Sequence, residues 1–312
     1  MEISPVGKRH VVLVGAGAVG VTLAGFLRQQ DHRVTLITRT GTRDALPLRI
    51  SDEINDRELT LEGVKLCQAD ELPPTPDQVV ICTRGEQLEE ALRSLRGKLE
   101  PSVPVTIAAA TFDSLPALAR TNGLANPILR MGVGFAAWPV SQGRHRVYGY
   151  MPRGSAIACE GLPHDTAARN DLSRILSGSG LPTQAAPSAL FGRVFRAMLA
   201  VDVAWLLTYR RAHWELEALL AQPDLLALGA AAMREAVLCA LGSGALAHLF
   251  GAVPRATFTA FARRRASSAS QDYREVWRHH GPKIDAQTEF LSRQLIVGAR
   301  RNVEALRALS AH

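Results

Sequence analysis

The sequence contains little lysine, little cysteine and few aromatic residues. Its net charge of +7 comes almost entirely from arginine, because lysine occurs only as Lys8, Lys65, Lys98 and Lys283. The four cysteines lack the close spacing of a zinc site or a disulfide framework, which predicts no metal site and favours a reducing, cytoplasmic compartment. Aromatic residues make up 5% of the chain and are not interleaved with the arginines, so we expect no nucleic-acid partner.

The sequence also lacks a convincing membrane span. The uncharged residues 11–27 follow a basic triplet at 8–10 and imitate a signal peptide, but a glycine motif inside this run explains it better. The uncharged residues 236–254 contain a glycine-rich break and are at or below the length that crosses a bilayer, so we expect two helices there. We therefore expect no membrane association.

The glycine motif follows the first apolar run. Residues 9–14 read as a buried strand, the chain continues as Gly15-Ala-Gly17-Ala-Val-Gly20, and apolar residues then recur at helical spacing. In such a unit the first glycine allows a tight turn, the second lets the backbone approach a pyrophosphate, and the third lets the helix pack closely on the strand. The pyrophosphate lies at the helix N-terminus. The motif predicts that a dinucleotide is bound by Gly15, Ala16, Gly17, Ala18, Val19 and Gly20.

The end of the second expected strand bears on the choice of cofactor. Residues 32–38 form a β-branched run that ends before Arg39, and no acidic residue follows until Asp44. An acidic residue at this strand end binds the ribose 2′-hydroxyl of NAD, whereas an arginine accommodates the 2′-phosphate of NADP. We therefore predict NADP(H), with Arg39 on the 2′-phosphate. The alternative is that Arg39 is a solvated loop charge.

The first part of the chain alternates strand and helix patterns, which predicts an α/β domain with a doubly wound, mostly parallel sheet. The later strands have no helices between them and predict an antiparallel extension. Further helices are expected at 86–95 and 165–176. Further strands are expected at 59–66, 78–83, 103–110, 128–140, 148–151 and 156–160.

From residue 188 onward the pattern is all helical. Breaks are expected near 222–223, 242–244, 254 and 281–282, and the segment 181–187 is the expected connection between domains. We therefore divide the chain into a dinucleotide-binding domain at 1–185 and a helical domain at 186–312. The helical domain is where we expect a small-molecule substrate to be held, and where a homodimer would form if the chain forms one.

Several motifs together resemble the ketopantoate reductase (2-dehydropantoate 2-reductase) family over nearly the whole chain. They are Gly15-Ala-Gly17-Ala-Val-Gly20, Val79-Val-Ile-Cys-Thr-Arg84, Gly180-Leu-Pro, Met233-Arg-Glu-Ala-Val237, and Ser267-Ser-Ala-Ser-Gln-Asp272 with Ile284-Asp285. The resemblance implies a Rossmann domain followed by an all-α domain, similar to 6-phosphogluconate dehydrogenase, and NADPH-dependent reduction of a 2-keto acid. It also implies that Thr83 and Arg84 contact the cofactor and that Ser268 contacts the substrate, although Ser268 equally fits a helix cap.

The chain departs from the family where the proton is handled. The family uses a lysine on the first helix of its second domain, but this chain has no lysine from residue 99 to 282 and no asparagine between 171 and 301. Lys283 stands where the family signature has an acid. We therefore predict an NADPH-dependent oxidoreductase that reduces a C=O or C=N acceptor other than ketopantoate. The alternative is an NADP(H)-binding protein without redox turnover.

Asp202 and Arg196 are the candidate catalytic residues on the helix expected at 189–209. Asp202 lies in an apolar run, where a buried, unpaired carboxylate is costly. It therefore either pairs with an arginine such as Arg84 or Arg196, or has a raised pKa and donates a proton. Arg196 stays protonated, so it binds or polarises a substrate more readily than it donates a proton. A histidine at 279–280 is a further candidate donor, against the simpler interpretation of an exposed loop.

Overall fold

Two compact units make up the chain. The computed structural model describes residues 7–38, 49–52, 55–73, 75–141, 144–150, 155–159, 166–242, 258–260, 262–263 and 271–311. Contacts group residues 1–109 and 113–191 into a first unit, and residues 110–112 and 192–312 into a second. The domain boundary expected after residue 185 stays a prediction, because compactness does not define a functional domain. Within the described ranges, no helix has the length and hydropathy to cross a bilayer.

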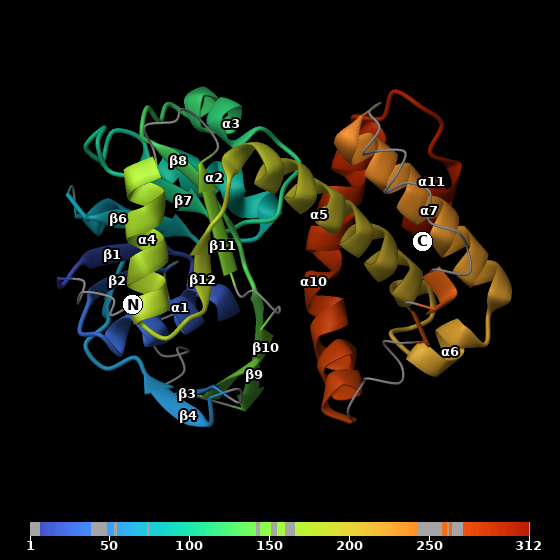
Figure 1. The fold of residues 1–312 in the computed structure, drawn as a ribbon, viewed down its shortest axis with the longest axis horizontal. Helices are drawn as coiled ribbons and strands as arrows, with labels where there is room; N and C mark the ends of the chain where they lie inside the picture. Colours follow the sequence, from blue (N-terminus) through green and yellow to red (C-terminus); the bar gives the residue numbers. More distant parts are fainter. Residues whose placement is uncertain are drawn as a thin grey trace. The chain divides into compact units, whose positions relative to one another are not determined.

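The first unit contains an eight-stranded sheet with the order β12-β11-β8-β7-β6-β1-β2-β5 (Figure 1). The six strands from β8 to β5 run parallel, whereas β11 is antiparallel to β8 and parallel to β12. The predicted doubly wound, mostly parallel sheet is confirmed. Its strands are β1 His10–Val14, β2 Arg33–Ile37, β5 Lys65–Cys67, β6 Gln78–Ile81, β7 Val105–Ile107, β8 Ile128–Gly132, β11 Ser155–Cys159 and β12 Thr183–Ala185.

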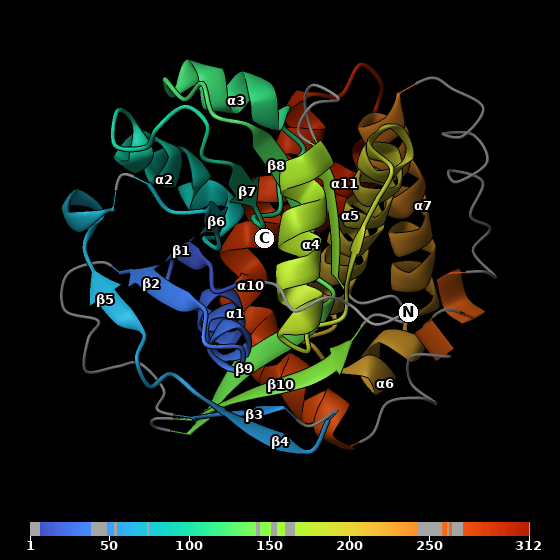
Figure 2. The ribbon, with the colours of Figure 1, turned by 60° about the vertical axis from the view of Figure 1, so that its left-hand side comes forward.

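Helices cover both faces of this sheet (Figures 1 and 2). One face carries α1 Ala18–Arg28 and α4 Thr166–Gly178, and the other carries α2 Leu88–Leu95 and α3 Leu115–Thr121. Side chains of β1 alternate between the two cores, with Val11 and Leu13 on the α1 side and Val12 and Val14 on the α2 side. Burial on both faces explains why the central strands read as continuous apolar runs.

A second sheet in the same unit has the order β4-β3-β10-β9 and consists of β3 Arg49–Asp52, β4 Arg57–Thr60, β9 Phe135–Ser141 and β10 Arg144–Tyr150. The single strand predicted at 59–66 is therefore wrong. The chain forms β4 of the second sheet, turns at Gly63 with φ of 76°, and enters β5 of the first sheet. Leu61 and Val64 in this turn pack against the core under α1, so the turn looked like part of a strand.

The segment 181–187, which was predicted to be only a connection between domains, also forms part of the sheet. It contains β12, which pairs in parallel with β11 through Ser155↔Thr183, Ala156↔Gln184 and Ile157↔Ala185. Only three residues pair, and two of them, Gln184 and Ala185, are exposed. A short, half-solvated edge strand has no alternating apolar pattern, and this is why the sequence did not reveal it.

After β12, every described element is a helix, as predicted: α5 Ser188–Arg211, α6 Leu216–Leu220, α7 Pro223–Leu241, α10 Gln271–Val297 and α11 Glu304–Ser310. The break predicted at 281–282 is wrong, because α10 is continuous there. Gly281 lies against the Trp214 ring, with no room for a Cβ atom. The glycine therefore permits close packing and does not end the helix. The break expected at Pro254 lies outside the described residues.

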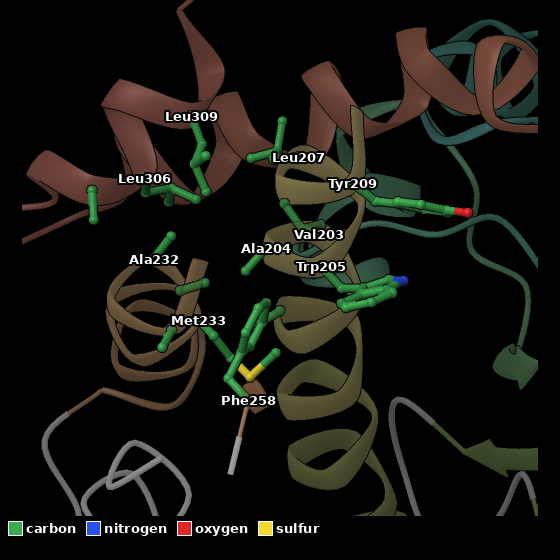
Figure 3. Packing of buried hydrophobic residues seen from close by; sticks show 14 of the residues in the cluster. Val203, Ala204, Trp205, Leu207, Tyr209, Ala232, Met233, Phe258, Leu306 and Leu309 are labelled. Carbon is green, nitrogen blue, oxygen red and sulfur yellow. The ribbon is translucent and has the colours of Figure 1, made fainter. Parts of the chain in front are cut away.

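The core of the second unit forms between α5, α7 and α11 (Figure 3). Val203, Ala204 and Leu207 lie on the buried side of α5 and belong to one cluster with Met233 of α7 and with Phe258 (Figure 3). Phe112, from the loop that follows β7, belongs to this same core although it is far from α5 in sequence. Residues 110–112 of the loop after β7 are thus part of the helical unit.

Candidate cofactor-binding site

The parallel strands of the first unit end at one level. Val14, the last residue of β1, pairs with Ile37 at the end of β2 and with Ile81 at the end of β6, and Ile81 pairs with Ile107 at the end of β7. Ligands of open parallel sheets bind at this carboxyl edge. The loops that leave these four strands therefore form the candidate site.

Gly15 and Gly20 shape the turn between β1 and α1. Gly15 has φ of 111°, a conformation that favours glycine, and its N–H donates to Ile37 O at 3.1 Å. A Cβ atom on Gly20 would overlap the carbonyl oxygen of Gly15 and lie 3.3 Å from Cys82 Cβ. These two glycines serve backbone geometry and close packing.

Gly17 differs from both because it faces open space. It is the N-cap residue of α1, and a Cβ atom placed on it would meet no described atom within 4 Å. Among the described residues no side chain caps the helix, and its first turn contains no acidic residue. The first N–H groups of a helix lack intrahelical acceptors and attract anions. The turn therefore has the shape and the electrostatics for a pyrophosphate, with Ala16 in the loop and Ala18 and Val19 in the first helical turn.

Thr83 and Arg84 follow β6 at the same edge. The Thr83 methyl group lies 3.1 Å from the Cβ position of Gly15, and the Thr83 hydroxyl is buried with no hydrogen-bond partner among the described residues. An unpaired buried hydroxyl is unfavourable and is suited to a ligand that would satisfy it. The Arg84 side chain is 47% exposed and its Nε lies 2.8 Å from Glu86 Oε1. Such exposed pairs are weak, so Glu86 does not prevent Arg84 from pairing with a phosphate.

Cys82 lies between these residues but is no candidate nucleophile. Burial raises the pKa of its thiol to about 12, and its S–H points to Val80 O at 3.6 Å. The thiol therefore stays protonated at neutral pH, and its role is to pack against Gly20. The described residues contain no cluster of His, Cys, Asp and Glu that would hold a metal ion.

Asp202 is more exposed in the structure than the sequence predicted. We expected it to be buried in an apolar run, but its residue is exposed on α5, whose buried side is formed by Ala200, Val203 and Ala204. The spacing explains the difference, since Asp202 is in line with exposed Met198 and Val194, which are four and eight residues earlier. Desolvation is thus no reason to assign it a role, and its catalytic role stays a prediction.

Arg196 is held by backbone carbonyls. Its Nε donates to Ala240 O at 3.1 Å and its Nη1 to Phe112 O at 2.8 Å. These bonds favour a structural role over the predicted catalytic or substrate-binding one, which stays a prediction. Arg39, Ser268 and the side chains of His279 and His280 lie outside what the structure describes.

Sequence reasoning missed Gln294 of α10. Its Oε1 accepts the N–H of Phe112 at 3.0 Å, and its Nε2 donates to Thr111 Oγ1 at 3.1 Å. The partners are more than 180 residues apart in the chain, so no local pattern indicated them.

Comparison with known proteins supports the resemblance. Residues 11–142 match the family model of ketopantoate reductase PanE/ApbA. No curated protein matches the sequence. The match covers most of the first unit, including the glycine turn after β1 and the loop that contains Thr83, but less than half of the chain.

Solved structures share the fold over almost the whole chain. A D-mandelate dehydrogenase with NADH and anilino(oxo)acetate is 14% identical with a TM-score of 0.72, and covers 96% of each chain. A PanE/ApbA family ketopantoate reductase from Ralstonia eutropha is 20% identical with a TM-score of 0.71, and covers 97% of this chain and 96% of its own. The protein therefore has the fold of ketopantoate reductases, a Rossmann domain followed by a helical domain, as predicted.

Proposed function

We propose that this chain is an NADP(H)-dependent oxidoreductase of the ketopantoate reductase family that reduces a C=O or C=N acceptor other than ketopantoate. The observation that carries the proposal is the glycine turn: the fold requires glycine at Gly15 and Gly20, whereas at Gly17 no described atom is near and no described side chain caps the helix. The family match over 11–142 and the NADH bound by the similar D-mandelate dehydrogenase support a dinucleotide at this place.

The residues present fit the cofactor. The first N–H groups of α1 would bind the pyrophosphate, the Thr83 hydroxyl would gain the partner that it lacks, and Arg84 would add a positive charge. Arg39, which follows the strand end, would bind the 2′-phosphate of NADP. Bound NADPH supplies a hydride to the acceptor.

The acceptor is proposed to differ from ketopantoate because the chain lacks the residues that the family uses for the proton. No lysine occurs from residue 99 to 282, and α5 presents Asp202 instead. A carboxylic acid on this helix would give a proton to the nitrogen of an imine without any need for a lysine. Asp202 therefore favours a C=N group among the acceptors that we predict.

The proposal is tested by measuring cofactor binding and turnover separately. NADPH is titrated by its nicotinamide fluorescence, and its oxidation is followed with ketopantoate, aromatic 2-keto acids, ketones and cyclic imines. We expect tight NADPH binding, turnover with at least one imine or ketone, and a kcat/KM for ketopantoate below about 10⁴ M⁻¹s⁻¹, the lower end for ordinary enzymes. Efficient ketopantoate reduction would contradict the altered specificity, and NADPH binding without oxidation of any acceptor would indicate a binding protein.

We also propose that the helical unit forms a homodimer. A similar ketopantoate reductase from Staphylococcus aureus is described as dimeric. Light scattering should give twice the chain mass of 33.7 kDa, and a monomer at micromolar concentration would contradict the proposal.

A further inference from the structure

Three polar backbone groups in the loop that leaves β7 are bound by side chains. The N–H of Phe112 is bound by Gln294 and its carbonyl oxygen by Arg196, and the carbonyl oxygen of Asp113 accepts from Arg130 Nη2 at 3.2 Å. Thr111 is fully buried and Phe112 is 7% exposed. We call residues 111–113 and the three side chains that bind their backbone the β7 clasp.

The clasp begins at residue 111, four residues after the last residue of β7. Arg39 follows β2 and would bind the adenosine half, and Gly17 would bind the pyrophosphate beyond β1. In the strand order β2-β1-β6-β7, the nicotinamide half must then continue over β6 and β7. From β2 to β7 there are three strand spacings, or about 14 Å, which sets the span of the site.

The residues between β7 and the clasp have short side chains without polar groups. They are three alanines, Ala108, Ala109 and Ala110, and the first donates its N–H to Ile81 O of β6 at 2.9 Å. Because methyl groups neither extend nor form hydrogen bonds, this stretch contributes only its backbone and its shape. Its position is set by the packing of the three methyl groups against the hydrophobic cores, by the hydrogen bond to β6 and by the clasp.

Gln294 and Arg196 suit this role chemically. Arg196 binds Phe112 O and Ala240 O with two different nitrogens, which a lysine with one nitrogen cannot do in the same geometry. Gln294 uses its oxygen for Phe112 and its nitrogen for Thr111, so a carboxylate or an apolar side chain would lose at least one bond.

We infer that Gln294 and Arg196 are positioning residues that fix the 108–110 backbone as a wall for the nicotinamide ring. This inference rests on the proposed function and assigns Arg196 to the loop, not to proton transfer. Misplacement of a reacting group by about 1 Å can cost about a hundredfold in rate. Loosening the clasp should therefore affect the nicotinamide end and leave the phosphate contacts at α1 intact.

The test compares Gln294→Met and Arg196→Lys with two matched controls. Gln287→Met repeats the glutamine change in the same helix, at a glutamine whose side chain has no hydrogen bond within the described part of the chain. Arg193→Lys repeats the arginine change at an exposed arginine one helical turn from Arg196. Melting curves establish that each variant is folded. The readouts are hydrogen exchange of the 108–114 peptide without cofactor, the NADPH Kd, the emission of bound nicotinamide, and kcat.

We expect Gln294→Met and Arg196→Lys to speed exchange of the 108–114 peptide, change the nicotinamide emission, and lower kcat by about a hundredfold, with the Kd for NADPH changed by less than about twofold. Both controls should behave as the wild type. Faster exchange with unchanged emission and kcat would overturn the inference, as would unchanged exchange. If the wild type binds NADPH but oxidises none, only the reductase proposal fails, and the emission still decides the inference.

Discussion

Gly20 lies against the carbonyl oxygen of Gly15, so closely that no Cβ atom fits between them, whereas Gly17 faces open space. Gly17 and Gly20 are three residues apart in one motif, yet the fold requires glycine at 20, whereas Gly17 is available to a ligand. This difference allows the fold and the proposed cofactor site to be tested separately.

Gly17→Ala should lower stability by only about 1 kcal/mol, since its φ of −76° suits alanine, no described atom is near, and only the preference of the N-cap for glycine over alanine is lost. Its methyl group should weaken NADPH binding by about tenfold or more, equivalent to about 1.4 kcal/mol. Gly20→Ala is the comparison, and its clash with Gly15 should cost about 3 kcal/mol of stability. Titration calorimetry and thermal melts measure both effects. Unchanged NADPH affinity in Gly17→Ala would argue against a pyrophosphate at this turn.

Arg39→Asp should reverse the cofactor preference. Removal of the guanidinium and addition of a carboxylate should weaken NADPH binding and spare or improve NADH binding, because only NADPH has the 2′-phosphate. Arg33→Asp makes the same charge change at the opposite end of β2 and should not alter the preference. Fluorescence titration of both cofactors is the measurement, and an NADPH affinity equal to that of the wild type would refute the assignment of Arg39.

Asp202→Asn should lower turnover by about 10²–10⁴-fold, the usual contribution of a group that handles the proton. Since Asp202 is exposed, its loss should change stability by less than about 1 kcal/mol, so the kinetic effect would not arise from unfolding. The experiment pairs a melting curve with NADPH oxidation on the best acceptor from the panel. Full turnover in this variant would move the role of proton donor to another residue.

Stability should fall as the pH is lowered below about 6.5. The pKa values of His10 and His32 are lowered mainly by burial, and then by Arg33 for His10 and by Arg9 for His32. His32 Nδ1 also accepts the N–H of Arg9 at 3.1 Å, which requires an unprotonated nitrogen. The unfolded chain therefore binds protons that the folded chain does not, so stability is lost from pH 6.5 downward until the lowered pKa values are passed.

Melting curves between pH 8 and pH 5 test this, and about 6.5 should be the onset of the decrease. The variant His10→Gln with His32→Gln should show a smaller decrease, while exposed His213→Asn should follow the wild type. An equal decrease in all three proteins would assign the pH dependence to other groups.

The sequence predicted the elements whose physical cause is local. Residues 9–27 contain a buried strand, a turn that needs glycine at two positions and a buried apolar helix, and all three were located correctly. The helical second half was predicted for the same reason, since its apolar residues recur at the helical period.

Features that depend on distant partners were decided by the tertiary structure alone. The turn at Gly63 separates strands of two different sheets, β12 exists because β11 offers it an edge, and Gly281 continues a helix because Trp214 packs on it. Burial of Asp202 was misjudged because an apolar run does not say which side of its helix faces the core. The β7 clasp joins Phe112 to Arg196 and Gln294 across 84 and 182 residues. A hydrogen bond of that separation leaves no periodicity in the chain, because each partner is determined only when the whole unit has folded.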